Sequence, residues 1–485
     1  MPNLSASLHN ALSGLATLGR VSETIAANVS NASTPGYAPR EAVIAQRVIG
    51  SVGYGASVVG IQRYVDPFLL ADRRFAEAEL AKTSEQTAFY ATLEARIGLP
   101  DDAGSLSGRL AQFGAELIQS ASRPDSEGRL QGVLDAAKAV ATHLNNASDA
   151  VQMERMRADA EIATGVDFIN TTLDQIVALN GAAMRSDTLG HDRLAIMDQR
   201  QRLIDDIAQL IPVREVTRDN GTVALFTPGG SILLDGTAAR LEFSPAGTIV
   251  PELNVGAGLL SGLTINGQAV STNADKGPIA GGKLAALFDV RDVQAPAVQT
   301  RLDAFARDLI SRFESPAVDP TLGIGDPGLF TDDGSAFVVA DEVGLSARIS
   351  VNALVDPSQG GELWRLRDGL GAATPGQAGD ATLLNALSDA FNTAQIPASG
   401  GFAIARSASG LAGELVSSVA AAHTSFASTQ SFSQARAETL TNTELQNGVD
   451  TDTELQRLLL VERAFAANAK VISTIDELIQ TLIRI

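Results

Sequence analysis

The two ends of the chain carry its most regular apolar pattern. After Val449 the remaining residues contain neither glycine nor proline, and apolar side chains recur there at alternating spacings of three and four residues. These positions are Leu458, Val461, Phe465, Asn468, Ile472, Ile475, Ile479 and Leu482, and only Asn468 is polar. The pattern predicts a helix with a coiled-coil seam, beginning at about Asp452 behind a capping box of Thr451 and Glu454.

A second seam lies in the first 30 residues. Its positions are Leu4, Leu8, Ala11, Leu15, Leu18, Ser22, Ile25 and Val29. Two such helices could pair within one chain and close a domain by joining its ends. Alternatively, the seams serve neighbouring copies of the chain and become ordered only when those copies arrive. Periodicity alone leaves both readings open.

Between the ends, the apolar period changes twice. Helical patterns cover 68–96, 106–122, 129–164, 166–179 and 193–211, and helices return at 281–313 and 411–445. Period-two patterns with Asn-Gly turns at 220–221 and 266–267 predict hairpins, and short strand-like pieces occur at 347–351 and 362–366. We therefore expect a mainly α fold with a β-rich outer domain, in which the chain runs outward through nested domains and back.

The expected domain boundaries follow these changes of pattern. A terminal coiled-coil assembly domain comprises residues 1–60 and 448–485. An elongated helical-bundle domain comprises residues 61–215, 277–313 and 402–447. An inserted β-rich outer domain comprises residues 216–276 and 314–401.

A dense turn cluster ends the first helix. Pro35 keeps Thr34 out of the helical region and Gly36 admits a positive φ, so the chain changes direction there. The segment ANVSNASTPGY at 27–37 resembles the N-terminal signature of the bacterial flagellar axial proteins, which form rods, hooks and hook-associated structures. The segment AANAKVISTIDEL at 466–478 is similar to their closing helix. The signature positions are Asn28, Asn31, Thr34, Pro35, Gly36 and Tyr37.

Three interior segments, 55–69, 194–210 and 281–292, resemble the members of that family that form the hook-filament junction. In the second segment, Gln201 stands where those members suggest an acid. The resemblance implies a structural adaptor that polymerises at the distal end of the hook and joins hook to filament, with the two seams as subunit interface. The alternatives are a hook or rod subunit of the same family, or an axial protein that carries an enzymatic insert.

The resemblance also implies partners and a location. The partners would be further copies of the chain, the flagellar hook protein, hook-associated protein 3 with the filament beyond it, and a cytoplasmic export chaperone. The location would be the bacterial flagellum, outside the cell. The resemblance further implies secretion through the type III flagellar export apparatus without a cleaved signal peptide, and the first residues show no signal-peptide pattern.

Composition argues against several kinds of partner and site. The 36 basic and 56 acidic residues give a net charge of −20, which disfavours nucleic acid or an anionic membrane as a partner. The absence of cysteine excludes disulfides and thiolate metal sites. Gly323–Gly328 matches a dinucleotide fingerprint, but Pro327 interrupts it, and Asp450–Glu454 resembles a calcium loop with Leu455 in place of its glycine. We expect no catalytic residue, no cofactor, no metal and no enzymatic activity.

Overall fold

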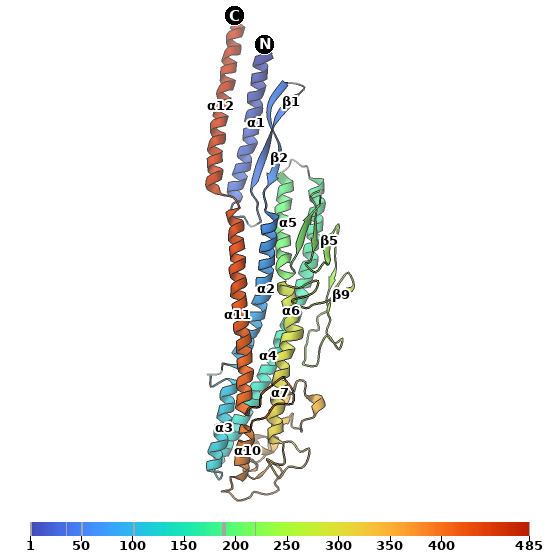
Figure 1. Ribbon diagram of the computed structural model, residues 1–485, viewed down its shortest axis with the longest axis vertical. Helices are drawn as coiled ribbons and strands as arrows, with labels where there is room; N and C mark the ends of the chain where they lie inside the picture. The colour runs from blue at the N-terminus through green and yellow to red at the C-terminus, as the bar shows by residue number, and fades with distance from the viewer. Residues whose placement is uncertain are drawn as a thin grey trace.

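The computed structural model describes residues 2–34, 36–49, 52–99, 102–186, 191–218 and 220–484. The molecule is elongated and mostly helical, with its long helices running along its length (Figure 1). Helices α1 (Pro2–Asn31) and α12 (Thr451–Arg484) lie side by side and antiparallel at one extremity. The predicted terminal helices are therefore present, and they contact each other within one chain.

An antiparallel hairpin completes this terminal part. Strands β1 (Arg40–Ile49) and β2 (Val52–Arg63) pair with each other and pack against α1. The hairpin lies on the side of α1 away from α12, so the order across the molecule is α12, α1 and hairpin (Figure 1). The terminal part therefore consists of two helices and one hairpin.

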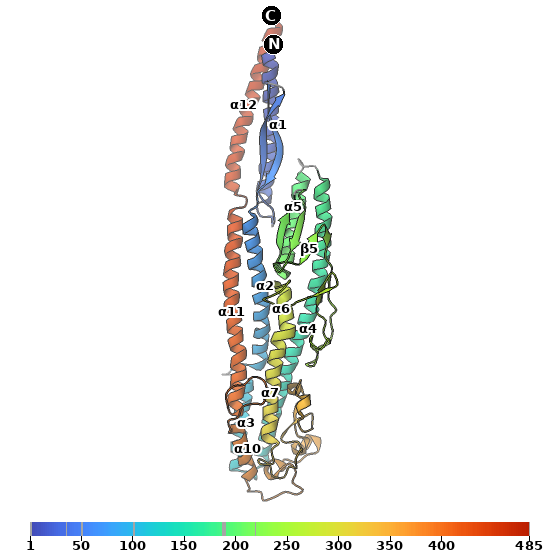
Figure 2. The ribbon, with the colours of Figure 1, turned by 45° about the vertical axis from the view of Figure 1, so that its right-hand side comes forward.

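The body is built on one long helical pair and a third long helix. Helix α2 (Pro67–Ile97) runs beside α11 (Ala408–Gln446), and α4 (Glu127–Arg185) runs along the opposite side of the molecule (Figures 1 and 2). The α4 helix is one uninterrupted element of 59 residues, so the break expected near residue 165 was wrong. Gly165 there faces Leu284, and a Cβ on the glycine would lie 3.6 Å from that side chain. That distance is an ordinary van der Waals contact, so the packing does not require a glycine here, and the glycine does not end α4.

The remaining helices pack against these three long helices. They are α3 (Leu106–Ser122), α5 (His191–Leu210), α6 (Gly282–Asp289), α7 (Ala295–Phe313) and α10 (Thr382–Asn392), with the π-helical turn η1 (Val290–Gln294) joining α6 to α7. At the end far from the termini, the Phe113 ring lies 5.9, 5.7 and 5.6 Å from the rings of Phe313, Phe330 and Phe391. The continuous apolar core extends from Phe89 to Val419 and, among the side chains that the structure describes, includes none from α1 or α12.

Side chains set the helix starts. Asp66 accepts from the Phe68 and Leu69 amides at 2.9 and 3.2 Å, and Pro67 fits the first turn of α2 because its missing N–H is not needed there. Ser105 and Ser407 cap α3 and α11 in the same way. Gly98, with φ of 88°, ends α2 where the sequence predicts the break.

Two small antiparallel sheets lie along α4. Strands β3 (Arg214–Thr217), β4 (Val223–Phe226), β5 (Ile232–Asp235) and β6 (Thr237–Ala238) form the first, and β7 (Leu241–Glu242), β8 (Leu263–Ile265) and β9 (Gln268–Val270) form the second. Two asparagines of α4 hold them. Asn180 exchanges two hydrogen bonds with the Val223 backbone at 3.0 and 3.1 Å, and Asn170 does the same with Leu241 at 2.8 and 2.9 Å.

The segment 314–401 packs around α3, α4 and α7, away from these sheets (Figure 1). It contains the strand pair β10 (Phe330–Asp332) and β11 (Ile349–Val351), together with α8 (Leu345–Arg348), α9 (Arg365–Asp368) and three short turns of 3-10 helix at 339–341, 353–355 and 357–359. Of the two strand-like pieces expected from the sequence, the first contains β11. The second was wrong, because it leads into the short helix α9.

Candidate assembly interface

The structure brings the two predicted seams onto the contacting helices α1 and α12. Ala11, Ile25 and Ile475 are buried there, while Phe465 is 47% exposed. The other described seam positions are half-buried: Leu4, Leu8, Leu15, Leu18, Ser22, Val29, Leu458, Val461, Asn468, Ile472 and Ile479. Pro35 and the side chain of Leu482 lie outside the described residues. One chain therefore pairs its own seams but buries few of their side chains completely.

The apolar surface of α12 is wider than its seam. At 100° per residue, Leu460, Val471 and Leu478 fall along one flank of the seam, and Ile483 falls along the other, on the same side as the seam residue Phe465. All five side chains are large and exposed. The three-four spacing of the seam did not reveal these flanks, although the same sequence carries them. A single copy leaves them in contact with solvent.

Asn468 of α12 faces Gly14 of α1. Its side-chain amide donates to the Ala464 carbonyl of its own helix at 3.0 Å. A Cβ on Gly14 would come within 3.2 Å of the Asn468 Oδ1 atom. The glycine therefore makes room for the one polar residue of the α12 seam.

Asn28 joins the predicted signature turn to the beginning of α12. Its side-chain oxygen accepts from the Tyr37 hydroxyl at 2.9 Å and from the Arg40 amide at 3.0 Å. Its side-chain nitrogen donates to the Arg40 carbonyl at 2.8 Å and to Glu454 Oε1 at 3.1 Å. Asn28 is only 1% exposed, so all four bonds are made in the interior. The signature identified Asn28, but nothing local to it identified Glu454.

The capping box predicted from Thr451 and Glu454 was wrong. Helix α12 begins at Thr451, and Asp450 caps it by accepting from the Asp452 amide at 3.0 Å and from the Thr453 hydroxyl at 2.7 Å. The bond from Thr453, together with the backbone amides, lowers the pKa of Asp450. Glu454 is unavailable for a reciprocal cap because its carboxylate is turned toward Asn28.

Asp198 of α5 fastens the hairpin to the body. Its two oxygens accept from Arg40 Nη2 at 2.6 Å and from Arg63 Nε at 2.7 Å. Arg63 also donates to the side-chain oxygen of Gln201, so the amide at that position serves as an acceptor beside the acid. Gly36, with φ of 74°, completes the contact, because a Cβ there would lie 2.5 Å from the Arg202 side chain.

A second ionic cluster joins the four elements α2, α5, β3 and α11 just inside the body. Arg74 of α2 pairs with Asp205 at 2.6 Å and with Glu215 at 2.8 Å, and neighbouring Arg73 pairs with Asp205 at 2.8 Å and with Glu444 of α11 at 2.5 Å. Burial raises the pKa of Glu444, and the Arg73 guanidinium opposes that effect.

We refer to Asn28, Glu454, Asp198, Arg40 and Arg63 as the joint, since they connect the terminal part to the body.

The motifs that resembled small-ligand sites have structural roles. In Gly323–Gly328, the Asp326 carboxylate accepts from the Gly323 amide at 2.7 Å and closes a turn. Among the described residues, no group of three or more histidines or acids is placed to hold a metal ion. No described helix combines the length and apolarity that crossing a bilayer would require.

Comparisons with known proteins agree with the terminal signatures and with the helical body. The family model described as the flagellar hook-associated protein FlgK helical domain matches residues 96–316. The models for the flagella basal body rod protein and for the flagellar basal body rod FlgEFG protein C-terminal region match 8–37 and 446–485. The matched segments occur in the order expected of flagellar axial proteins, the class to which the fold and the joined termini point.

Two curated relatives indicate which member of this class the chain resembles. Flagellar hook-associated protein 1 of Salmonella typhimurium is 26% identical over 247 residues, covering 49% of this chain and 44% of the relative. Its namesake from Bacillus subtilis is 23% identical over 281 residues, covering 53% and 55%. The chain thus spans about half the length of the curated relatives it matches. By these matches it resembles the flagellar hook-associated protein 1 family.

A solved structure of the same name is also similar. The flagellar hook junction protein FlgK from Burkholderia pseudomallei matches with a TM-score of 0.40 and 21% identity, covering 54% of this chain and 46% of that one.

Proposed function

We propose that this protein is a structural subunit, not an enzyme, that polymerises at the distal end of the flagellar hook and joins the hook to the filament. The name shared by its relatives supports this role. The family model of the hook-associated helical domain covers the body, whereas the rod models match only the two ends. This difference favours a junction subunit over a hook or rod subunit.

The observation that carries the assembly role is the uncovered apolar surface of α12. Leu460, Val471 and Leu478 are exposed in the single chain. Fully burying a side chain of this kind contributes about 1.5 to 3 kcal/mol, so covering the flank with a neighbour would yield several kcal/mol per subunit. We infer that 1–60 and 448–485 form the assembly domain, with the seams as its interface, and that the nested domains of 61–447 fold around their own core.

The partners follow from this role. We propose that the assembly domain contacts further copies of the chain, and that the assembled ring or helix contacts the flagellar hook protein on one side and hook-associated protein 3 and the filament on the other. A cytoplasmic export chaperone would cover the exposed flank of α12 before type III flagellar export. The mature location is then outside the cell, on the flagellum.

Asn468 has a further role in this proposal. A buried amide at a seam position forces partner helices to align so that the amide is hydrogen-bonded, at some cost in stability. We infer that Asn468 fixes the register between helices. Asn468→Leu would strengthen helix association but give misaligned assemblies, and faithful assembly of that variant at the junction would remove the inference.

A complementation experiment tests whether assembly needs the exposed flank of α12. In a strain lacking this protein, a variant with Val471→Asp and Leu478→Asp should leave hooks without filaments in electron micrographs, because two charges would have to be buried between subunits. The matched control is Val338→Asp with Val339→Asp, two exposed valines on the body. Normal filaments from the α12 variant would overturn the proposed role.

A further inference from the structure

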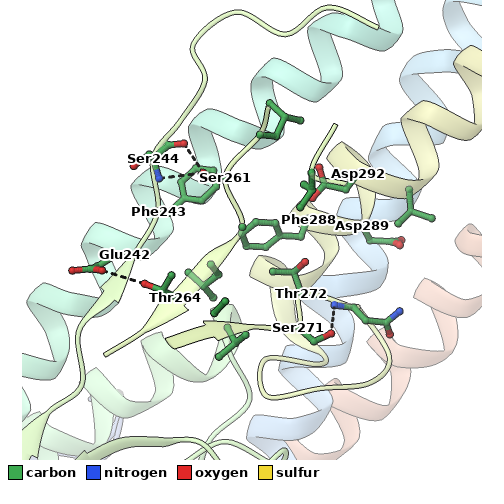
Figure 3. A pocket seen from close by; sticks show the side chains of 18 residues that line it. Glu242, Phe243, Ser244, Ser261, Thr264, Ser271, Thr272, Phe288, Asp289 and Asp292 are labelled. Atoms are coloured by element: carbon green, nitrogen blue, oxygen red, sulfur yellow. Dashed lines mark hydrogen bonds between the residues drawn. The ribbon is translucent and has the colours of Figure 1, made fainter. Parts of the chain in front are cut away.

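A groove of about 800 Å³ lies between the second sheet and the helix pair α6–η1. Phe243 and Phe288 meet edge to face at its base, with ring centroids 5.6 Å apart (Figure 3). Leu263 and Val270 from the sheet line it as well, and Val293 from η1 is 55% exposed at its margin. The groove therefore offers an apolar seat that is open to solvent.

The π-helical turn η1 holds the two aromatic rings at the base of the groove in place. Arg291 of η1 is fully buried behind it, pairs with Asp159 at 2.7 Å and donates to the Ser261 carbonyl at 2.8 Å. Its guanidinium lies 5.3 and 5.1 Å from the Phe243 and Phe288 ring centres. A π turn often occurs where a helix must redirect a side chain in this manner. The rings are thus held from behind, and the charge of Arg291 is already matched.

The margin of the groove is acidic. Its lining includes Glu242, Asp289 and Asp292 and contains no lysine, arginine or histidine. Asp292 pairs with Arg291 at 2.8 Å. By contrast, Asp289 accepts from two neutral glutamine amides at 3.0 and 3.1 Å, and Glu242 accepts from the Thr264 hydroxyl at 3.2 Å. In the described part of the chain, neither Glu242 nor Asp289 forms a salt bridge, so the margin attracts a cation.

One edge of the sheet beside the groove is free. Strand β9 pairs only with β8, through Ile265 with Gln268 next to the Asn266-Gly267 turn, then Thr264 with Ala269. Because hydrogen-bonded and non-hydrogen-bonded pairs alternate from such a turn, the amide and carbonyl of Ala269 point to the free edge. Ala269 also lines the groove. A backbone arriving there would find both a donor and an acceptor.

We propose that this groove docks an extended segment of another protein in which an apolar side chain stands next to a lysine or arginine. The apolar side chain would enter the seat beside Val293, the cation would meet Glu242 or Asp289, and the backbone would pair with Ala269. Adding a strand to a free sheet edge is a known mode of peptide recognition. The site lies on the body, and it does not depend on the assembly role of α12.

The test uses the full-length protein and the capped peptide KVKVKV, with EVEVEV and KSKSKS as matched controls. Titration calorimetry should detect KVKVKV alone, and NMR should shift the Leu263 and Val270 methyl groups. Glu242→Gln should weaken binding roughly fivefold, as expected for one exposed charge pair. Val293→Ser should weaken it similarly, whereas Val338→Ser should not.

Three results would overturn the proposal. The first is the absence of methyl shifts with KVKVKV. The second is equal binding of EVEVEV or KSKSKS. The third is a dimer of the protein itself that Val293→Ser dissociates in sedimentation, because the occupant would then be a second copy of the chain.

Discussion

Asn28 and Glu454, 426 positions apart in the sequence, share a buried hydrogen bond of 3.1 Å. Asn28 closes the turn that follows the first helix, and Glu454 lies in the first turn of the last helix. Because Asn28 also binds Tyr37 and both backbone groups of Arg40, one amide fixes the hairpin and both terminal helices. Through this bond, the signature residue Asn28 holds the beginning of α12 in position.

Asn28→Ala should therefore destabilise the terminal part. The change leaves the Arg40 amide and the Glu454 carboxylate buried without this partner, and an unsatisfied buried polar group costs about 1 to 3 kcal/mol. Hydrogen exchange should show faster amide exchange at the start of α12. Ser30→Ala is the control, because Ser30 is exposed on the same helix. Unchanged exchange in Asn28→Ala would mean that the helices seat without this bond.

The salt bridges of Asp198 with Arg40 and Arg63 should set the orientation of the terminal part relative to the body. Asp198→Asn leaves Arg40 and Arg63 without their carboxylate, and breaking a buried pair in this manner costs about 3 kcal/mol. The chain has no cysteine, so cysteines that carry spin labels can be introduced at the exposed positions 46, in the hairpin, and 96, in α2. The distance distribution between the labels should broaden in Asp198→Asn. It should stay narrow in Asp167→Asn, which alters an exposed acid of α4.

The sequence predicted the helices well because periodicity is a local property. It found both seams, the turn at Gly36 and the hairpin at Asn266. It could not find the joint, because Asp198 is 158 residues from Arg40 and 135 from Arg63. The capping error has the same origin. Thr451 and Glu454 have the right local spacing, but a partner 426 residues away takes the glutamate.

A buried histidine should make stability depend on pH. His143 donates from Nε2 to the Ile97 carbonyl at 3.0 Å, and burial lowers its pKa below the ordinary value of 6.5. The unfolded chain therefore binds a proton more readily than the folded one, so the free energy of unfolding falls as the pH drops below 6.5. His143→Asn should lessen this dependence in urea titrations between about pH 7 and pH 5. His9→Asn, on the exposed face of α1, should leave the dependence unchanged.

Removal of 472–485 should separate folding from assembly. The deleted part of α12 contains Ile472, Ile475 and Ile479, of which only Ile475 is fully buried in the single chain. The core from Phe89 to Val419 lacks any contribution from α12, so the melting temperature should stay near that of the parent in calorimetry. Assembly should fail, since each lost side chain removes about 1.5 to 3 kcal/mol of burial between subunits.

Two measurements, one on the truncated protein and one on the intact monomer, distinguish the roles of the terminal helices. In complementation, we expect bare hooks and filament subunits released into the medium. In the intact monomer, hydrogen exchange should be fast at 4–29 and 455–482 compared with α4, because the ordering of each residue costs about 1 to 2 kcal/mol and few seam side chains repay it. A collapsed melting transition, or strong protection of both seams, would instead mean that α1 and α12 serve to close the subunit's own fold.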